Sequence, residues 1–327
     1  MIIKKQAIQV FLLSLVFATI FYYVRDIEDV IKHNVDKTLG GDGVSDLSRY
    51  LGYYNSGSIN SITEMGLFNN SLYHWVMLFL KNIGIKFELC VFILILSYYI
   101  CFAKLSNVFI GIKKWYVISF VFCILSFWLI PLGSVAIRQG LAILTIAAFW
   151  PFLEQRKSFF LEILLVLIIA NIHSTALSLF PLIIFKRIFN GRLLLLDFIL
   201  FTALVLYIFN FWAFAVNQIL STLDYLKIES RSFTNPDTRY IVGFSAYKAI
   251  AFIIPAILYR VPAYLNYQRF KDLEGMYIFY VYYGLLAMLL SGLPYHDRVF
   301  LYAWAFSPIL ITTFAIYLLP LKTKQKY

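Results

Sequence analysis

The chain has 327 residues and a formal net charge of +11, and 61% of its residues are hydrophobic whereas 14% are charged. A soluble globular domain carries about 25% charged residues, so this composition excludes a soluble protein and predicts an all-α, polytopic integral membrane protein. The positive charge is then expected in cytoplasmic loops rich in Lys and Arg rather than on a surface that binds nucleic acid.

About eight apolar segments are candidates to cross a membrane, because their lengths are near the 20 or so residues that a transmembrane helix needs, with about 17 as a practical minimum. The first follows Lys4 and Lys5 without a small-residue cleavage site, so we expect it to be retained as a signal anchor. The candidate spans, in chain order, are Gln6–Val24, Glu88–Ala103, Tyr116–Pro131, Val135–Phe152, Leu193–Ala213, Phe244–Tyr259, Met276–Gly292 and Phe300–Leu319.

The segment Phe159–Phe185 is apolar but is interrupted by a polar stretch around His173. With a cytoplasmic N-terminus, one continuous span here would place every later cluster of Lys and Arg outside, against the positive-inside rule. We therefore predict a helical hairpin of two half-helices, which gives about ten membrane segments in all. Each arm of about 13 residues rises about 20 Å, less than the hydrocarbon core of about 30 Å. His173 is then expected within the membrane, beside a cavity open to the outer face.

Residues 1–327 show no internal repeat and no low-complexity linker, so we predict a single transmembrane domain. Its outer side carries a long loop at 25–87 and a shorter loop at 221–243. The long loop contains an amphipathic stretch at 26–39 and a short apolar piece at 72–80, which is expected to lie in the membrane interface.

Two arginines begin predicted spans at the outer face. Arg138 follows Ser134, a candidate N-cap, and Arg298 follows Asp297 in the same way. A helix N-terminus with an arginine fork favours phosphate groups, so Arg138, Arg298 and Ser134 are predicted to bind a phosphate or diphosphate. The alternative for each arginine is a side chain that snorkels to the lipid headgroups.

His173 is the main candidate for acid–base chemistry, as a general base or an orienting donor. The alternative is a neutral histidine that bonds the carbonyls of a broken helix. We expect His74 to be a bystander and Asp197 to lie at the membrane interface. We predict no metal site and no cofactor, because no acid–His spacing suggests a metal cluster and no nucleotide-binding pattern occurs. The three cysteines lie in apolar runs and give no disulfide signal.

Several short stretches together resemble the EpsG/Wzy family of bacterial polysaccharide polymerases. They are AIRQGLAILTIAAF at 136–149, NIHSTALSLFPLII at 171–184, HDRVFLYAWAF at 296–306, DLSRYLGYY at 46–54 and KNIGIKFELCVFIL at 81–94. The resemblance covers most of the chain in topology.

This resemblance implies a glycosyltransferase-C-like polymerase at the periplasmic face of the bacterial inner membrane, making O-antigen of lipopolysaccharide, capsule or exopolysaccharide. Such an enzyme transfers a growing glycan from undecaprenyl diphosphate to the non-reducing end of another lipid-linked repeat unit, and a chain-length regulator is a candidate partner. Arg138 and Arg298 would stabilise the leaving diphosphate in an inverting, metal-independent displacement, and His173 would activate the attacking hydroxyl. The candidate sugar-binding residues are Gln139, Arg239, Tyr240, Tyr295, His296 and Asp297, with Trp304 as a further stacking surface.

Four other functions compete with this one. An O-antigen ligase uses the same donor but usually carries a larger late outer loop than 221–243. A flippase or transporter of the lipid-linked oligosaccharide would also use outward arginines, although transporters usually show repeated halves. A membrane O-acyltransferase would need its histidine to face a cytoplasmic donor, and an assembly scaffold would need no active site.

Overall fold

The computed structural model describes residues 2–24, 46–57, 71–110, 120–122, 124, 136–155, 158–225, 242–293 and 296–318. Within these ranges all regular secondary structure is helical, which confirms the predicted all-α class. The chain divides into two compact units, Met1–Phe180 and Pro181–Tyr327. Each unit is described by itself.

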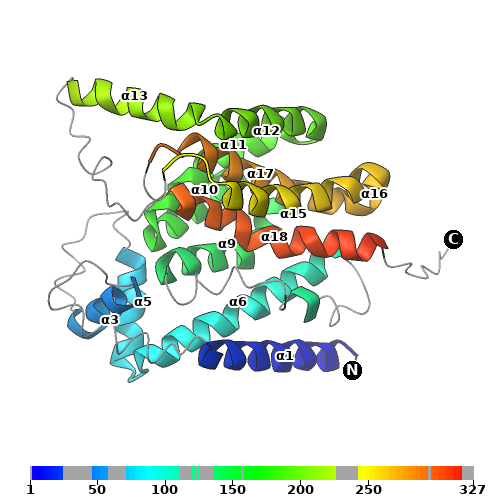
Figure 1. The fold of residues 1–327 in the computed structure, drawn as a ribbon. Helices are drawn as coiled ribbons and strands as arrows, with labels where there is room; N and C mark the ends of the chain where they lie inside the picture. Colours follow the sequence, from blue (N-terminus) through cyan, green and yellow to red (C-terminus); the bar gives the residue numbers. More distant parts are fainter. Residues whose placement is uncertain are drawn as a thin grey trace. The chain divides into compact units, whose positions relative to one another are not determined.

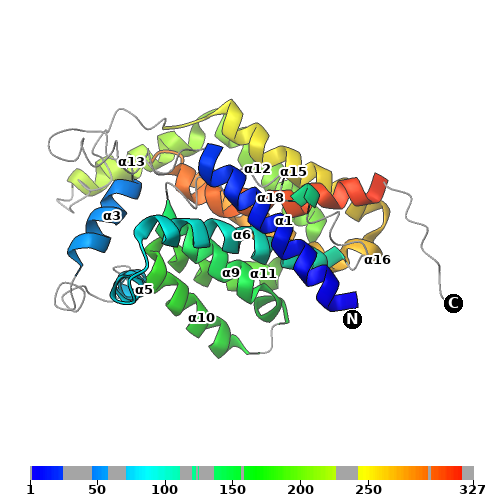
Figure 2. The ribbon, with the colours of Figure 1, turned by 90° about the horizontal axis from the view of Figure 1, so that it is seen from below.

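The first unit is built on α6 (Phe87–Ile110), which packs against α1 (Ile2–Val24) and α9 (Ile137–Gln155). Figure 1 shows α1 below α6, and Figure 2 shows α1 crossing in front of α6. The α10 helix (Phe159–Ile172) packs on α9 and on α5 (Ser71–Asn82), and α5 also contacts α3 (Asp46–Ser56). Two short helices of the predicted outer loop, α3 and α5, are thus held by the apolar helices of this unit.

A glycine turn fixes the corner between α5 and α6. Gly84 has φ +78°, its N–H donates to the Lys81 carbonyl, and the Ile85 N–H donates to the Leu80 carbonyl. This pair of bonds is the Schellman arrangement that glycine permits at a helix end. The Tyr54 hydroxyl donates to the Ile85 carbonyl. The C-terminal half of α3 is therefore bonded to this corner, which sets where the tyrosines of α3 lie.

The second unit surrounds α17 (Glu274–Leu289), in which nearly every residue is buried. Around it pack α15 (Ala246–Leu265), α18 (His296–Leu318), α12 (Leu193–Ile208) and α13 (Phe211–Tyr225). The unit is completed by α11 (Leu179–Phe189), η3 (Lys271–Leu273) and the single turn α16 (Tyr267–Phe270).

Aromatic stacking aligns three helices of the second unit. The ring of Phe252 on α15 stacks on Tyr280 of α17, with centroids 5.0 Å apart and planes 10° apart, and it also contacts Phe300 of α18. Tyr283 of α17 stacks on Tyr302 of α18 at 4.7 Å. These pairs make α15 and α18 parallel neighbours, with α17 antiparallel to both. Their N-terminal ends consequently lie side by side.

Three described helices are long and apolar enough to span a membrane: Phe87–Ser106 of α6, α15, and Arg298–Leu318 of α18. The described apolar parts of α1, α9 and α10 are shorter than 18 residues. Most of the predicted span Tyr116–Pro131 lies outside the described residues. The structure thus supports a helical membrane protein, and the count of eight spans plus a hairpin stays a prediction.

One predicted span, Leu193–Ala213, is not a continuous helix. It breaks at Phe209–Asn210, where α12 and α13 meet at a bend of 72°; the two helices pass as one span only when taken together, and the sequence did not predict this bend. Asn210 has φ +57°, a left-handed conformation that asparagine tolerates better than most residues. Its side-chain Oδ1 also accepts a hydrogen bond from the Phe244 N–H at 2.6 Å. The bend is therefore bonded to the segment that leads into α15.

The predicted break near His173 is confirmed. The α10 helix ends at Ile172, His173 is extended with φ −151° and ψ 119°, and η2 (Ser174–Ser178) precedes α11. The α10 arm has 14 residues and the α11 arm has 11, which give rises of about 21 and 16 Å. Both arms are shorter than a hydrocarbon core. Their folding back within the membrane remains a prediction.

Candidate functional site

Arg138 lies in the first turn of α9, as the sequence predicts. Its guanidinium carbon lies 5.1 Å from the centroid of the Tyr50 ring on α3. A cation at this distance over an aromatic face is attracted by about 0.5–2 kcal/mol. The Nε atom of Arg138 is buried and has no hydrogen-bond partner among the described residues. A buried, unsatisfied donor favours a ligand role for this side chain over simple snorkelling, since such a donor costs free energy when it is left alone.

Four aromatic side chains from α3 and α5 form a cluster beside Arg138. The ring centroids of Tyr50 and Tyr73 are 5.7 Å apart, those of Tyr73 and His74 are 5.3 Å apart, and those of Tyr53 and His74 are 5.2 Å apart. Tyr73 is fully buried, and its hydroxyl has no hydrogen-bond partner in the described part of the chain. We call Tyr50, Tyr53, Tyr73 and His74 the aromatic cluster. It provides ring surfaces and an unused hydroxyl next to a fixed cation.

Burial and charge set the protonation states within this cluster. Burial lowers the pKa of His74 below its ordinary value of 6.5, and the nearby Arg138 charge lowers it further. Burial raises the pKa of Tyr73, an effect that Tyr50 reinforces and Arg138 opposes. Near neutral pH His74 is thus a neutral imidazole and Tyr73 a neutral phenol. His74 thus lies within electrostatic reach of Arg138, and its interpretation as a bystander stays a prediction.

The polar stretch that ends α10 is bonded to the same helix α5. The Ser71 hydroxyl lies 3.3 Å from Asn171 Oδ1, and the Asn171 amide nitrogen donates to the Leu167 carbonyl at 2.9 Å. His173 is buried, and its Nδ1 lies 2.6 Å from Thr175 Oγ1. The α5 helix therefore links the aromatic cluster to the segment that carries His173.

Gln139 is buried with 1% of its surface exposed. Gln139 directly follows Arg138, so the two side chains project from α9 in directions about 100° apart around the helix axis. The burial of Gln139 does not bear on sugar binding, so its contact with a sugar stays a prediction. The buried amide of Gln139 and the half-buried side chain of Arg138 place two polar groups at the start of an otherwise apolar helix.

In the second unit, His296 begins α18 and is 2% exposed. Its Nδ1 lies 3.1 Å from the Leu293 carbonyl and its Nε2 lies 3.3 Å from Lys248 Nζ. A carbonyl can only accept, so Nδ1 carries the proton and Nε2 accepts from the Lys248 ammonium. Lys248 lies in the first turn of α15 and Arg298 in the first turn of α18. The parallel packing of α15 and α18 thus brings two cationic residues and a neutral imidazole to one end of this unit.

Sequence reasoning missed Lys248 and the tyrosines of the cluster. Lys248 is the only charged residue in AYKAIAFIIPAIL at 246–258, a signal that was available in the sequence. Tyr50 and Tyr53 lie in DLSRYLGYY at 46–54, a stretch that carries the family resemblance, but nothing in the sequence indicated that they meet Tyr73 and Arg138.

Some predicted site residues fall outside what the structure describes: Ser134, Arg239, Tyr240, Tyr295 and the side chain of Asp297. Arg138 and Arg298 belong to different units, so their shared diphosphate site stays a prediction. Trp304 is buried and stacks on Phe300 with centroids 5.2 Å apart, so the prediction that it offers an open face to sugars is wrong. Among the described residues, no three His, Cys, Asp or Glu side chains are grouped to hold a metal ion.

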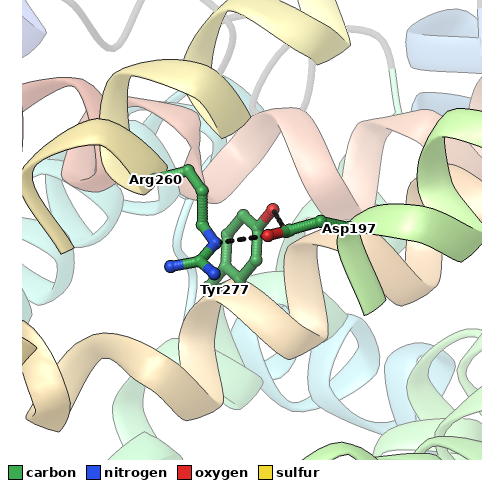
Figure 3. A network of polar contacts seen from close by, with 3 residues as sticks. All are labelled: Asp197, Arg260 and Tyr277. Carbon is green, nitrogen blue, oxygen red and sulfur yellow. Dashed lines mark hydrogen bonds and ion pairs between the residues drawn. The ribbon is translucent and has the colours of Figure 1, made fainter. Parts of the chain in front are cut away.

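Asp197 belongs to a polar network that joins three helices (Figure 3). Its Oδ2 accepts from Arg260 Nε on α15 at 2.6 Å, and its Oδ1 accepts from the Tyr277 hydroxyl on α17 at 2.8 Å. The sequence interpretation of Asp197 as merely interfacial is therefore incomplete, because this carboxylate on α12 is a bridge between helices.

These features define a helical membrane protein with arginine-bearing helix starts, a broken apolar segment and an aromatic cluster held by its first long loop. The model of the EpsG family matches residues 39–327, and the chain belongs to this family. Family membership confirms the resemblance seen in the sequence and supports a polysaccharide polymerase-type function. Searches of curated proteins and of solved structures gave no match.

Proposed function

We propose that this chain is a polysaccharide polymerase that transfers a growing glycan from undecaprenyl diphosphate to the non-reducing end of a second lipid-linked repeat unit. The observation that carries the proposal is Arg138: a fixed guanidinium with a buried, unused Nε donor beside a cluster of aromatic rings. Guanidinium groups bind phosphate oxygens through paired N–H bonds, and aromatic rings with polar tips suit sugar rings.

In this reaction the acceptor hydroxyl oxygen forms a bond to the anomeric carbon of the donor glycan. The bond from that carbon to the diphosphate oxygen breaks, and its electron pair leaves with the diphosphate, so the configuration inverts. Negative charge thus develops on the leaving oxygen. Arg138 stabilises this charge, and stabilisation by fixed donors in a low-dielectric site is usually the largest contribution to such catalysis. Lys248 and Arg298 provide a second cationic group for the lipid-linked substrates.

The proton of the acceptor hydroxyl goes to a histidine. His173 is the proposed base, in the tautomer whose Nδ1–H donates to Thr175 Oγ1, because Nε2 is then the basic nitrogen. His74 is neutral and lies near Arg138, which makes it the second candidate. Neither the sugars nor the linkage enters this proposal.

The test is the surface polysaccharide of the native host after Arg138→Ala, with Lys271→Ala as the control because Lys271 is an exposed cation that belongs to the other unit. At equal membrane levels of protein, Arg138→Ala should reduce the long ladder on a gel to single repeat units. Lys271→Ala should leave the ladder unchanged.

The same gel separates the competing functions. A flippase would leave no repeat units outside the membrane after loss of Arg138, and a ligase would leave full-length polymer on the lipid carrier. An unchanged ladder with Arg138→Ala would overturn the proposal.

A further inference from the structure

A cavity in the second unit includes Arg260 of the Asp197 network and lies apart from Lys248 and His296. It has a volume of about 260 Å³ and lies between the start of α12 and the last turns of α15. Two arginines line it, Arg192 and Arg260, together with the apolar side chains Leu193, Leu194, Ala263 and Tyr264. Arg260 follows Lys248 by 12 residues on the same helix, a rise of about 18 Å. This cavity is therefore distinct from the Lys248–His296 end of the unit.

The guanidinium of Arg260 has donors to spare for a ligand. Asp197 accepts only from Nε, and Figure 3 shows the two terminal nitrogens pointing away from Asp197. The Tyr277 hydroxyl holds the other carboxylate oxygen at 2.8 Å. Because Asp197 is fixed on both oxygens, Arg260 is held in one orientation, with 19% of its side chain exposed. A guanidinium that is oriented in advance loses less entropy when it binds an anion.

Arg192 supplies a second positive charge at the same cavity. It occupies the N-cap position of α12, and its side chain makes no capping hydrogen bond. The preceding turn is fixed, since the Gly191 N–H donates to the Glu274 carboxylate. No carboxylate lines the cavity itself among the described residues. Two guanidinium groups on one small cavity match a phosphate group, to which each can donate two hydrogen bonds.

The surroundings of the cavity are apolar and exposed. On α12, Leu194 is 72% exposed and Phe198 is 67% exposed; on α15, Tyr264 is 74% exposed and Leu265 is 61% exposed. In a membrane protein, such side chains face lipid tails. A ligand with a phosphate at the two arginines and hydrocarbon attached to it would lie with its chains against these residues.

The distribution of charge assigns this end of the unit to one leaflet. Arg192 and Arg260 belong to the Lys- and Arg-rich segments that the positive-inside rule places in the cytoplasm. Basic pockets between helices on that side bind anionic lipid head groups. We propose that the cavity between α12 and α15 binds the phosphate of an anionic glycerophospholipid of the cytoplasmic leaflet.

The test uses the full chain purified in detergent and freed of lipid, with equal amounts of phosphatidylglycerol and phosphatidylcholine added. Native mass spectrometry then counts the lipids that each protein retains. The wild type should retain phosphatidylglycerol in preference to phosphatidylcholine. Arg192→Gln should lower the affinity for phosphatidylglycerol about tenfold, as expected for the loss of a charge-assisted hydrogen bond. Its unfolding should be unchanged, because the Arg192 side chain makes no capping bond.

Two further variants complete the design. Arg260→Lys keeps a cation next to Asp197 but loses the planar fork, so it should also weaken binding of phosphatidylglycerol. Lys271→Gln removes an exposed charge outside the cavity and should bind like the wild type. Equal loss in Lys271→Gln and Arg192→Gln would overturn the proposal in favour of general surface attraction. Displacement of phosphatidylglycerol by inorganic phosphate at similar concentration would also overturn it, since the cavity would then take a free anion.

Discussion

Gly284 on α17 lies against the Phe252 ring of α15, and Gly284→Ala should destabilise the second unit. A Cβ atom at this position would lie 2.0 Å from Phe252 Cζ and 2.1 Å from Cε2, whereas ordinary contact begins at 3.4 Å. The ring would have to withdraw by about 1.4 Å, yet it is fully buried and stacks on Tyr280. Overpacking of this kind costs about 1–3 kcal/mol, and alanine regains at most about 1 kcal/mol of helix propensity. We expect a net loss of about 1–2 kcal/mol in the free energy of unfolding.

The assay is unfolding of the purified chain in mixed micelles, titrated with denaturing detergent. Phe252→Leu should remove the clash, so the double variant should be more stable than the sum of the two single losses by at least about 1 kcal/mol. Gly52→Ala is the matched control, because a Cβ there meets nothing within 4 Å; it should not destabilise the chain. Wild-type stability in Gly284→Ala, or strict additivity with Phe252→Leu, would refute the packing described here.

Two further predictions concern polar groups. Asp197→Asn and Tyr277→Phe should each destabilise the chain by about 1–3 kcal/mol, as expected for a hydrogen bond to a charged group, and a double-mutant cycle should show coupling above about 0.5 kcal/mol; independent effects would contradict the network. His74 has a pKa lowered below 6.5, so its contribution to stability is complete above that pH and is lost as pH falls from 6.5 toward the folded pKa. His74→Gln should flatten this part of the stability–pH curve, and an unchanged slope would contradict the burial of His74 beside Arg138.

The sequence was sufficient to predict features that depend only on residues close together along the chain. The break at His173 follows from polar residues inside an apolar run and from the charge that succeeds it. The position of Arg138 in a first helical turn follows from the proline and glycine that precede the helix. The same reasoning failed at Asn210, because a single asparagine in an apolar run does not indicate that its backbone will turn left-handed and bond to Phe244.

The sequence did not predict contacts between segments that are far apart along the chain. The packing of α3 and α5 places Tyr50 over Arg138 and His74 near it, across about 90 residues of chain. Lys248 meets His296 because α15 and α18 pack side by side, with Phe252 against Phe300. From the sequence alone Asp197 is expected to be an interfacial acid, whereas in the structure it accepts hydrogen bonds from Arg260 and Tyr277. Tertiary packing, rather than composition or periodicity, decides all three.

The central claim is tested most directly by incubating the purified chain with a synthetic undecaprenyl-diphosphate-linked repeat unit and no other protein. Polymerase activity predicts a ladder of lipid-linked oligomers, with one undecaprenyl diphosphate released for each linkage formed. Arg138→Ala should abolish both products, and Lys271→Ala should retain both. The proposed function would be contradicted if oligomers formed equally well with Arg138→Ala. It would also be contradicted if the wild-type chain moved the lipid-linked unit across vesicle membranes without lengthening it.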